Sequence, residues 1–534
     1  MQTILGRLTA SRALASVLLA NLISLVVLNG LSLRTVDLLI VYPIAFASAA
    51  FVLAGAGVRR VQILYPKVTL LWALAFFGCL TVPRAAYLLE WIPGNVVLAQ
   101  ADDYGRLAEL VSMTMTERYP LAHFANQDFL LSHYYAALFP MAFLKFAIPP
   151  MTLKDAIFAG NLLYHLLFVF SLAELAARWF PAPRAYATFL FLWSFFGGLD
   201  WLFYANVLFE HAEHWPRMVF GQIREISSFY TGLYWVVHHF MAFYSVLLIL
   251  LFATALRFRT QRLKITVLGM LLIGAFYSSV FATFTAFILA PAQIWRLGKR
   301  AWRTRAFLWL TPMLLVPLFL YTNRVQKTSM VWAPVHLGTF LAPVVGSFAY
   351  VVSAVMIDLA GIPVVLFFVR NRFTARERAL FWTSIAFLVS TGFIESIGFN
   401  NYSMRGMFLP TAVFFYLFAR YCSHLVRRGV MLVVALSAIT VVREVAYLTY
   451  QPLMFSSWYW SATGREAPPE AKALLRSEYA ALARDRSVRY YVGEPGSKEG
   501  MHKYNAGKLV QLSVEAMHPA EYELLRNPRR SWFW

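Results

Sequence analysis

The stretch that decides the fold is residues 14–31, which read LASVLLANLISLVVLNGL and hold no charged side chain. A helix needs about 20 predominantly apolar residues to cross roughly 30 Å of hydrocarbon. The run follows Arg7 and Arg12, as a signal peptide would, but such a peptide has an apolar region of only about 7–15 residues. A second apolar block begins near residue 36. We therefore expect a retained membrane-spanning helix.

Apolar blocks of similar length recur along most of the chain. Of the 534 residues, 60% are hydrophobic and only 14% are charged, whereas a soluble domain is nearer half apolar and a quarter charged. Each block is expected to be helical, since lipid offers no partner to backbone polar groups. The prediction is an all-α polytopic membrane protein with about 13 transmembrane helices. They are expected near 13–31, 36–56, 69–91, 155–177, 185–206, 232–256, 265–278, 279–296, 306–321, 343–369, 379–396, 407–425 and 429–448.

The net charge of +21 would suit a nucleic-acid-binding protein. We exclude nucleic acid as a partner because most Lys and Arg residues lie in short loops between apolar blocks, where they set orientation in the membrane. One-sided placement of these loops predicts a multi-pass membrane protein with a cytoplasmic N-terminus and an extracytoplasmic C-terminus. The basic loops are 59–67, 178–184, 257–264, 296–305, 370–378 and 427–428.

Two segments need special treatment for this topology to hold. Residues 128–150 are expected to lie at the outer interface or to dip in and return. Residues 265–296 are expected to form a hairpin of two short helices that turns near Tyr277, Ser278 and Ser279. The transmembrane domain is then 1–448, and residues 449–534 are expected to form a small extracytoplasmic α/β appendage.

The chain lacks the short motifs of several enzyme classes. It has no Walker loop, Rossmann glycine pattern, zincin motif or nucleophile elbow. Its two cysteines, Cys79 and Cys422, lie in or at the end of apolar helices and cannot build a disulfide framework or a zinc site. Polar residues instead gather in three expected outer segments, namely 92–154, 207–231 and 397–406.

The first outer segment contains adjacent carboxylates, Asp102 and Asp103, followed by Arg106 and the pair Tyr134-Tyr135. Adjacent carboxylates can hold a metal ion, or one can accept a proton from a sugar hydroxyl because its neighbour raises its pKa. Ordinary solvated charges are the alternative interpretation.

The second outer segment contains Arg224 and Glu225 and leads into a span that carries His238 and His239. Ionisable groups inside a span usually face a cavity or a pathway; a hydrogen bond between helices is the alternative. His211 and His214 have a spacing that could bind a metal, which is weak evidence. No residue is assigned as a metal ligand, and a divalent metal cofactor is left open.

The third outer segment contains Asn401 and Arg405. Arginine is usually found in cytoplasmic loops, so an arginine on the outer side needs another explanation. Its planar guanidinium group can bind two oxygens of a phosphate. A lipid headgroup is the alternative partner. Asp358, in the middle of an expected span, is predicted to face a cavity.

The order of these motifs resembles the GT-C superfold of membrane glycosyltransferases that use polyprenyl-phosphate-linked sugars. Members are expected to show an Asp-Trp pair, a Trp-x-Pro-Gln-His segment and an Asn-Asp-Phe-x-Met-Arg segment. The corresponding segments here are Asp103-Tyr104, Trp235 to His239, and Asn400 to Arg405. Tyr replaces Trp, the Pro-Gln is missing and Asn401 replaces an Asp, which puts a second acidic site in doubt. The resemblance covers about residues 90–425 and is to bacterial members, which implies a location in the bacterial inner (cell) membrane.

The resemblance implies transfer of a sugar from a polyprenyl-phosphate donor to a glycan or lipid acceptor at the outer face of the membrane, with inversion. A polysaccharide polymerase or ligase, and a flippase or transporter of lipid-linked glycans, are the alternatives. Membrane lipids are the other expected partners. The expected catalytic residues are Asp103 and Asp102, the donor phosphate ligands are Arg405, Arg224, His239 and His238, and the substrate-binding residues are Tyr134, Tyr135, Glu225 and Asn401.

Overall fold

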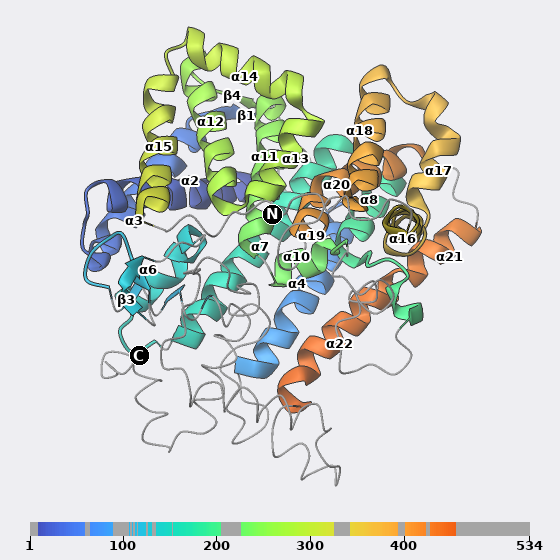
Figure 1. Ribbon diagram of the computed structural model, residues 1–534, viewed down its shortest axis with the longest axis horizontal. Helices are drawn as coiled ribbons and strands as arrows, with labels where there is room; N and C mark the ends of the chain where they lie inside the picture. Colours follow the sequence, from blue (N-terminus) through green and yellow to red (C-terminus); the bar gives the residue numbers. More distant parts are fainter. Residues whose placement is uncertain are drawn as a thin grey trace.

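The structure, a computed structural model, is mostly helical and carries two small two-stranded sheets (Figure 1). It describes residues 9–58, 65–88, 106, 109–110, 113–114, 116–123, 126–130, 135–151, 153–203, 226–235, 237–324, 342–393, 401–422 and 428–454. The expected α/β appendage lies outside these residues, except for the end of the last helix.

The N-terminal helices begin and end close to the expected spans. They are α2 (Thr9–Gly30), α3 (Leu38–Ala54, after the short helix η1, Thr35–Asp37), α4 (Pro66–Leu88) and α7 (Leu153–Trp179). Polar side chains join α2 to α7, since Asn21 Nδ2 donates to the Tyr164 hydroxyl over 3.0 Å. The carboxylate of Glu174 on α7 accepts hydrogen bonds from the backbone nitrogens of Ala10 and Ser11 at 3.1 and 2.9 Å. A buried carboxylate thus caps the N-terminal turn of α2, where a helix favours negative charge.

The apolar segment 128–150 contains a short helix. The segment begins with the end of strand β3 (Asn126–Leu130), which pairs with β2 (Ala122–His123). The helices η2 (Tyr135–Leu138) and α6 (Phe139–Ala147) follow. α6 is too short to cross a bilayer. Lys145, in its last turn, is buried and donates to the carbonyls of Pro149 and Met151 at 2.9 and 2.6 Å. The short strands were not expected in an all-helical chain.

The expected span 185–206 is wrong as a single helix. It divides into α8 (Pro183–Phe195) and η3 (Asp200–Phe203). Gly198 has a φ of +75°, and a Cβ added there would lie 2.6 Å from the carbonyl oxygen of Asp358. Only glycine allows both the left-handed backbone and this close approach. The expected span 232–256 corresponds to α10 (Phe229–Trp235) and α11 (Val237–Ala255), and residue 236 between them lies outside the described residues.

The expected break between two short helices is confirmed at Ser279. α12 (Gln261–Ser278) is followed by α13 (Val280–Leu289), and the Ser279 hydroxyl accepts a hydrogen bond from the Ala282 nitrogen, which caps α13. The predicted helix 279–296 is wrong beyond Leu289, because α14 (Pro291–Arg303) follows as a separate helix that packs against α12 and α13. α15 (Phe307–Arg324) completes this group.

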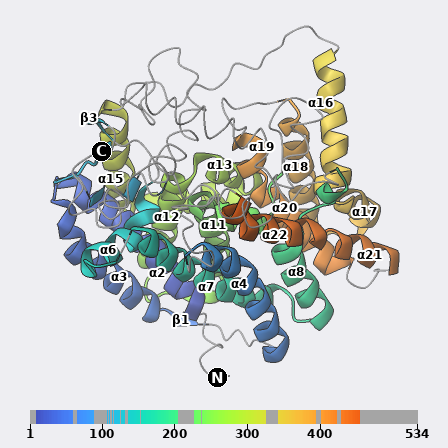
Figure 2. The ribbon, with the colours of Figure 1, turned by 90° about the horizontal axis from the view of Figure 1, so that it is seen from below.

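The expected span 343–369 is sharply bent. α16 (Ala342–Ser353) passes into a π-helical segment, η5 (Ala354–Asp358), and then into α17 (Ile362–Val369). The two halves meet at 87°, and Figure 2 shows α16 projecting at the edge of the structure with α17 at one of its ends. Gly361, with a φ of +71°, and the proline after Ile362 explain the break.

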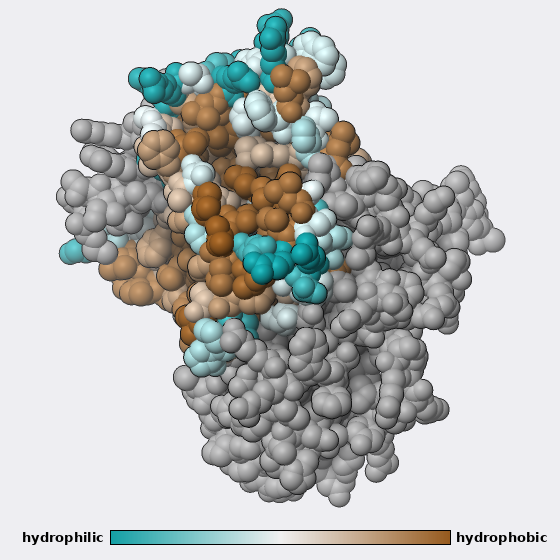
Figure 3. All heavy atoms as spheres, turned by 90° about the vertical axis from the view of Figure 1, so that its left-hand side faces the viewer, coloured by the Kyte–Doolittle hydropathy of each residue, from teal (hydrophilic) through white to brown (hydrophobic). Residues whose placement is uncertain are grey.

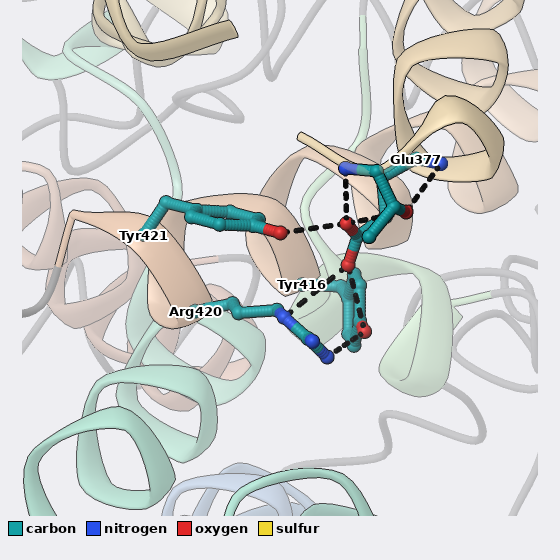
Figure 4. A network of polar contacts seen from close by, with 5 residues as sticks. Glu377, Tyr416, Arg420 and Tyr421 are labelled. Carbon is teal, nitrogen blue, oxygen red and sulfur yellow. Dashed lines mark hydrogen bonds and ion pairs between the residues drawn. The ribbon is translucent and has the colours of Figure 1, made fainter. Parts of the chain in front are cut away.

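The remaining helices are α18 (Ala375–Thr391, after η6, Arg370–Arg372), α19 (Asn401–Gly406), α20 (Phe408–Tyr421), α21 (Arg428–Leu436) and α22 (Ala438–Met454). The expected span 429–448 is therefore interrupted at Ser437. Near the start of α18 and the end of α20, Glu377 accepts hydrogen bonds from Thr374 and from the Tyr421 hydroxyl, the latter over 2.6 Å (Figure 4). The Arg420 guanidinium lies 3.2 Å from the same carboxylate.

Five of the described helices are long and apolar enough to cross a membrane, or up to six if the bent pair is one span. They are Ala10–Gly30, Thr35–Ala54, Pro66–Ala85, Asp155–Trp179 and Val237–Ala255. This indicates a membrane protein, while the expected number of about 13 stays a prediction. On one face of the structure, a broad hydrophobic area lies beneath a hydrophilic cap (Figure 3).

Candidate functional site

The structure describes the side chains of four of the ten residues that the sequence assigns to a site: Tyr135, His238, His239 and Arg405. All four are buried. Asn401 begins α19, and its side chain is outside the description. The other five, Asp102, Asp103, Tyr134, Arg224 and Glu225, lie outside the described residues.

A small cavity joins the first outer segment to the helix bundle. Its volume is about 10 Å³, which is space for roughly one water molecule. It is lined by Arg106, Glu109, Ala137, Leu138, Met141, Asn161, Val237 and His238. These residues come from the first outer segment, η2, α6, α7 and α11. One of the predicted phosphate ligands, His238, therefore lies against polar residues of the segment that carries the predicted catalytic acids.

Charged and polar groups in this cavity are deeply buried. Arg106 and Glu109 are 5% and 3% exposed, and Asn161 is fully buried. Neither amide atom of Asn161 has a hydrogen-bond partner among the described residues. A buried polar group of this kind costs free energy unless water or a ligand satisfies it. The cavity therefore suits a bound water molecule or a single polar group of a ligand.

A second group of buried side chains fixes α10 just before the histidines. Arg84 of α4 donates to the carbonyl of Tyr234 over 2.7 Å, and its guanidinium lies 4.3 Å from the centroid of the Tyr234 ring. Tyr230 donates to the carbonyl of Cys79 over 3.0 Å. These contacts tie α4 to α10, so that the start of α11 and His238 are held in place. His165, one turn beyond Asn161 on α7, is also fully buried.

The two histidines are in contact with each other, with ring centroids 4.0 Å apart. The next residue, Phe240, packs on Phe408 with centroids 5.9 Å apart. Phe408 follows Arg405 by three residues, so the packing brings the Arg405 segment beside α11. Among the described residues, however, neither His239 nor Arg405 lines the cavity.

The surroundings of Arg405 and Tyr135 include helix-to-helix contacts. The hydroxyl of Thr285 on α13 donates to the carbonyl of Gly406 over 2.8 Å, next to Arg405. The Tyr135 hydroxyl donates to Asn29 Oδ1 on α2 over 3.0 Å. A role in substrate binding for either residue therefore remains a prediction. Asp358 is buried where the bent helix turns, and that it faces a cavity stays a prediction.

Sequence reasoning missed Glu109, Asn161, His165 and Arg84. A signal was present for two of them, because Asn161 and His165 are polar residues one helical turn apart inside an expected span. Within the described residues, no group of three or more His, Cys, Asp or Glu side chains is arranged to hold a metal ion.

Comparison of the chain with protein-family models, with curated proteins and with solved structures gives no match.

Proposed function

We propose that this protein is a membrane glycosyltransferase that moves a sugar from a polyprenyl-phosphate donor to an acceptor at the outer face. The observation that carries the proposal is the cavity in which Arg106 and Glu109 meet Asn161 and His238. It joins a polar segment outside the spans to buried polar residues inside them. Enzymes that act on lipid-linked substrates need such a junction, because the lipid chain and the reacting phosphate occupy different environments.

The charges near the cavity suit a leaving phosphate. Arg106 and His238 line it, and Arg84 contacts Tyr234, four residues before His238. Asp103 precedes Arg106 by three residues, and three residues of chain reach at most about 11 Å. The proposed base, Asp103, is therefore connected by only three residues of chain to Arg106, which lines the proposed phosphate site. Arg405, Arg224 and His239 remain proposed ligands of the same phosphate.

The reaction is a single displacement. Asp103, assisted by Asp102, takes the proton from the acceptor hydroxyl as the acceptor oxygen bonds to the anomeric carbon. The bond from that carbon to the phosphate oxygen breaks, its electron pair leaves with the polyprenyl phosphate, and the configuration inverts. Cations stabilise the phosphate charge as it develops, where electrostatic catalysis is most effective.

We also propose the finer topology of about 13 spans, a GT-C-like arrangement and an extracytoplasmic C-terminus. Strand β1 (Gly57–Val58) pairs with β4 (Leu256–Arg257), which brings two of the basic loops together. α14 and the loop from α17 to α18 lie at the same end as this pair in Figure 1. Gathering of basic loops at one end supports a common cytoplasmic side.

The test uses the full chain in lipid nanodiscs, with a panel of radiolabelled polyprenyl-phosphate sugars and envelope glycolipids as acceptors. Wild-type protein is expected to release polyprenyl phosphate and to label the acceptor. Asp103→Asn should lower turnover by about 100- to 10,000-fold, the range for loss of a general base. Glu117→Gln, at an exposed acid of the same outer segment, should leave turnover unchanged. Failure of every donor in the panel, or equal turnover in Asp103→Asn, would contradict the proposal.

The bent helix favours a second candidate, a transporter of lipid-linked glycans. Transporters place substrates at broken helices, and α16 and α17 meet at 87° beside the buried Asp358. The same nanodisc experiment separates the two functions, because a transporter leaves the sugar–phosphate bond intact. Movement of intact donor across a proteoliposome membrane, without release of polyprenyl phosphate, would favour the transporter.

A further inference from the structure

α14 presents three distinct stripes of side chains along its length. Ile294 and Leu297 pack against the hydrophobic core of the protein. Trp295 and Trp302, seven residues apart, are 66% and 70% exposed. The basic residues of the helix form the third stripe, and all of them are exposed. They are Arg296, Lys299, Arg300 and Arg303.

The aromatic and basic stripes adjoin each other. The Lys299 ammonium lies 5.2 Å from the centroid of the Trp295 ring, and Trp302 stacks on Phe307 at the start of α15 with centroids 4.8 Å apart. No acidic residue occurs between 291 and 305. Exposed tryptophan beside an unneutralised row of cations is typical of helices that lie in a membrane interface.

The neighbouring helices show at which depth α14 would lie. Phe284 and Phe287 of α13 are 42% and 46% exposed, and Leu308 and Trp309 of α15 are 52% and 60% exposed. α14 connects the end of α13 to the start of α15, and it therefore lies where two lipid-facing surfaces end. Figure 1 shows it across one end of this helix group.

We propose that α14 lies in the headgroup layer of the membrane and binds anionic phospholipids through Arg296, Lys299, Arg300 and Arg303. The tryptophans would occupy the boundary with the acyl chains, while the cations contact phosphodiester groups. Charge complementarity identifies the occupant, because a zwitterionic lipid cannot neutralise four cations that lack a nearby acid in their own segment. The inference rests on the membrane location of the protein and is independent of sugar transfer.

The first experiment measures lipid retention by native mass spectrometry of the full chain, released from nanodiscs of phosphatidylcholine and phosphatidylglycerol in a ratio of 7:3. This composition is an experimental choice of about 30% anionic lipid, typical of an anionic leaflet. Each interfacial cation strengthens binding to an anionic surface severalfold. Replacement of Arg296, Arg300 and Arg303 by Gln should therefore weaken phosphatidylglycerol retention by about 100-fold.

The matched control replaces Arg372, Arg376 and Arg378 by Gln. These residues are also exposed, with Arg372 at the end of η6 and Arg376 and Arg378 near the start of α18, but no tryptophan stripe accompanies them. We expect the control to retain most of its phosphatidylglycerol. Equal loss in the two triple variants would overturn the proposal, because it would show only a nonspecific effect of net charge.

The second experiment locates α14 directly. Gly298 has open space where a Cβ would be, so Gly298→Cys in a variant without Cys79 and Cys422 can carry a small fluorophore. We expect quenching by lipids brominated near the headgroup. Quenching by aqueous iodide alone would place α14 in water, as for a surface that binds a soluble protein, and would overturn the proposal.

Discussion

Replacement of Asn161 by leucine separates a binding site from a structural contact. The side chain of Asn161 is fully buried, lines the cavity, and has no hydrogen-bond partner among the described residues for either amide atom. An unsatisfied buried polar group costs about 1–3 kcal/mol. Leucine has the same branched shape without the polar atoms. We therefore expect Asn161→Leu to stabilise the folded protein by about 1–3 kcal/mol and to abolish sugar transfer.

The matched control is Asn21→Leu on α2. Asn21 is also buried in the bundle, but only its Oδ1 lacks a partner among the described residues, while its Nδ2 donates to the Tyr164 hydroxyl over 3.0 Å. Loss of that hydrogen bond should cost about 0.5–1.5 kcal/mol and offset the gain from removing the unpaired oxygen, so Asn21→Leu should stabilise the protein less than Asn161→Leu does. The measurement is the midpoint of thermal unfolding in nanodiscs, together with donor turnover. If Asn161→Leu raises the midpoint no more than Asn21→Leu does, Asn161 is a structural contact and the cavity argument fails.

Four further predictions address other parts of the protein. Arg405→Lys should weaken use of the lipid-linked donor and leave the protein folded, because an ammonium cannot hold two phosphate oxygens as a planar fork does; full transfer activity in Arg405→Ala would contradict the assignment. Reporter fusions should be active outside the cytoplasm after residue 448 and inside it after residue 300, and a cytoplasmic tail would show that the span count is off by one. Burial tends to raise the pKa of Glu377, but hydrogen bonds from Tyr421 and Thr374 outweigh it and hold that pKa below its ordinary value. The stability that Glu377 contributes is therefore present at neutral pH and is lost as pH falls through the lowered pKa. Thermal unfolding of wild type and Glu377→Gln from pH 7 to 3 should show a difference in midpoint that disappears in acid. Gly198→Ala should destabilise the protein by more than about 1 kcal/mol in the same assay, because its Cβ would lie 2.6 Å from a backbone carbonyl; an unchanged midpoint would contradict the close packing of this turn.

Hydropathy predicted where most helices lie, but it did not predict where they break. Helix α12 ends at Ser278 as expected, since a pair of serines interrupts the apolar run there. The breaks at Gly198 and Gly361 were missed because single glycines are common inside membrane helices. Tertiary contacts distinguish these two glycines from others: the backbone of Gly198, for example, lies against the bent segment at Ile357 and Asp358. No local pattern encodes that contact.

The candidate site was only partly predictable for a similar reason. His238 was identified because an ionisable group inside an apolar run is conspicuous. Glu109 was not, because an acid in a polar segment looks like any solvated charge until the fold buries it at 3% exposure. To identify Asn161 from the sequence, one would have to know that its side of α7 faces α6 and α11. The sequence of an apolar helix with low amphipathicity does not reveal this. The predicted acids Asp102 and Asp103 lie outside the described residues, so their roles stay predictions.

The carboxylate that caps α2 has a consequence for the order in which the protein assembles during synthesis. Ala10 and Ser11 find their partner in Glu174, 164 and 163 residues later in the chain. At about 5–20 residues per second, the ribosome needs roughly 8–33 s to make that stretch. During this interval the first turn of α2 must rely on water, headgroups or the insertion machinery for its amide hydrogen bonds. Helix α2 is therefore completed only when α7 has been made, and a chain that stalls between the two should leave α2 with a frayed, protease-accessible start.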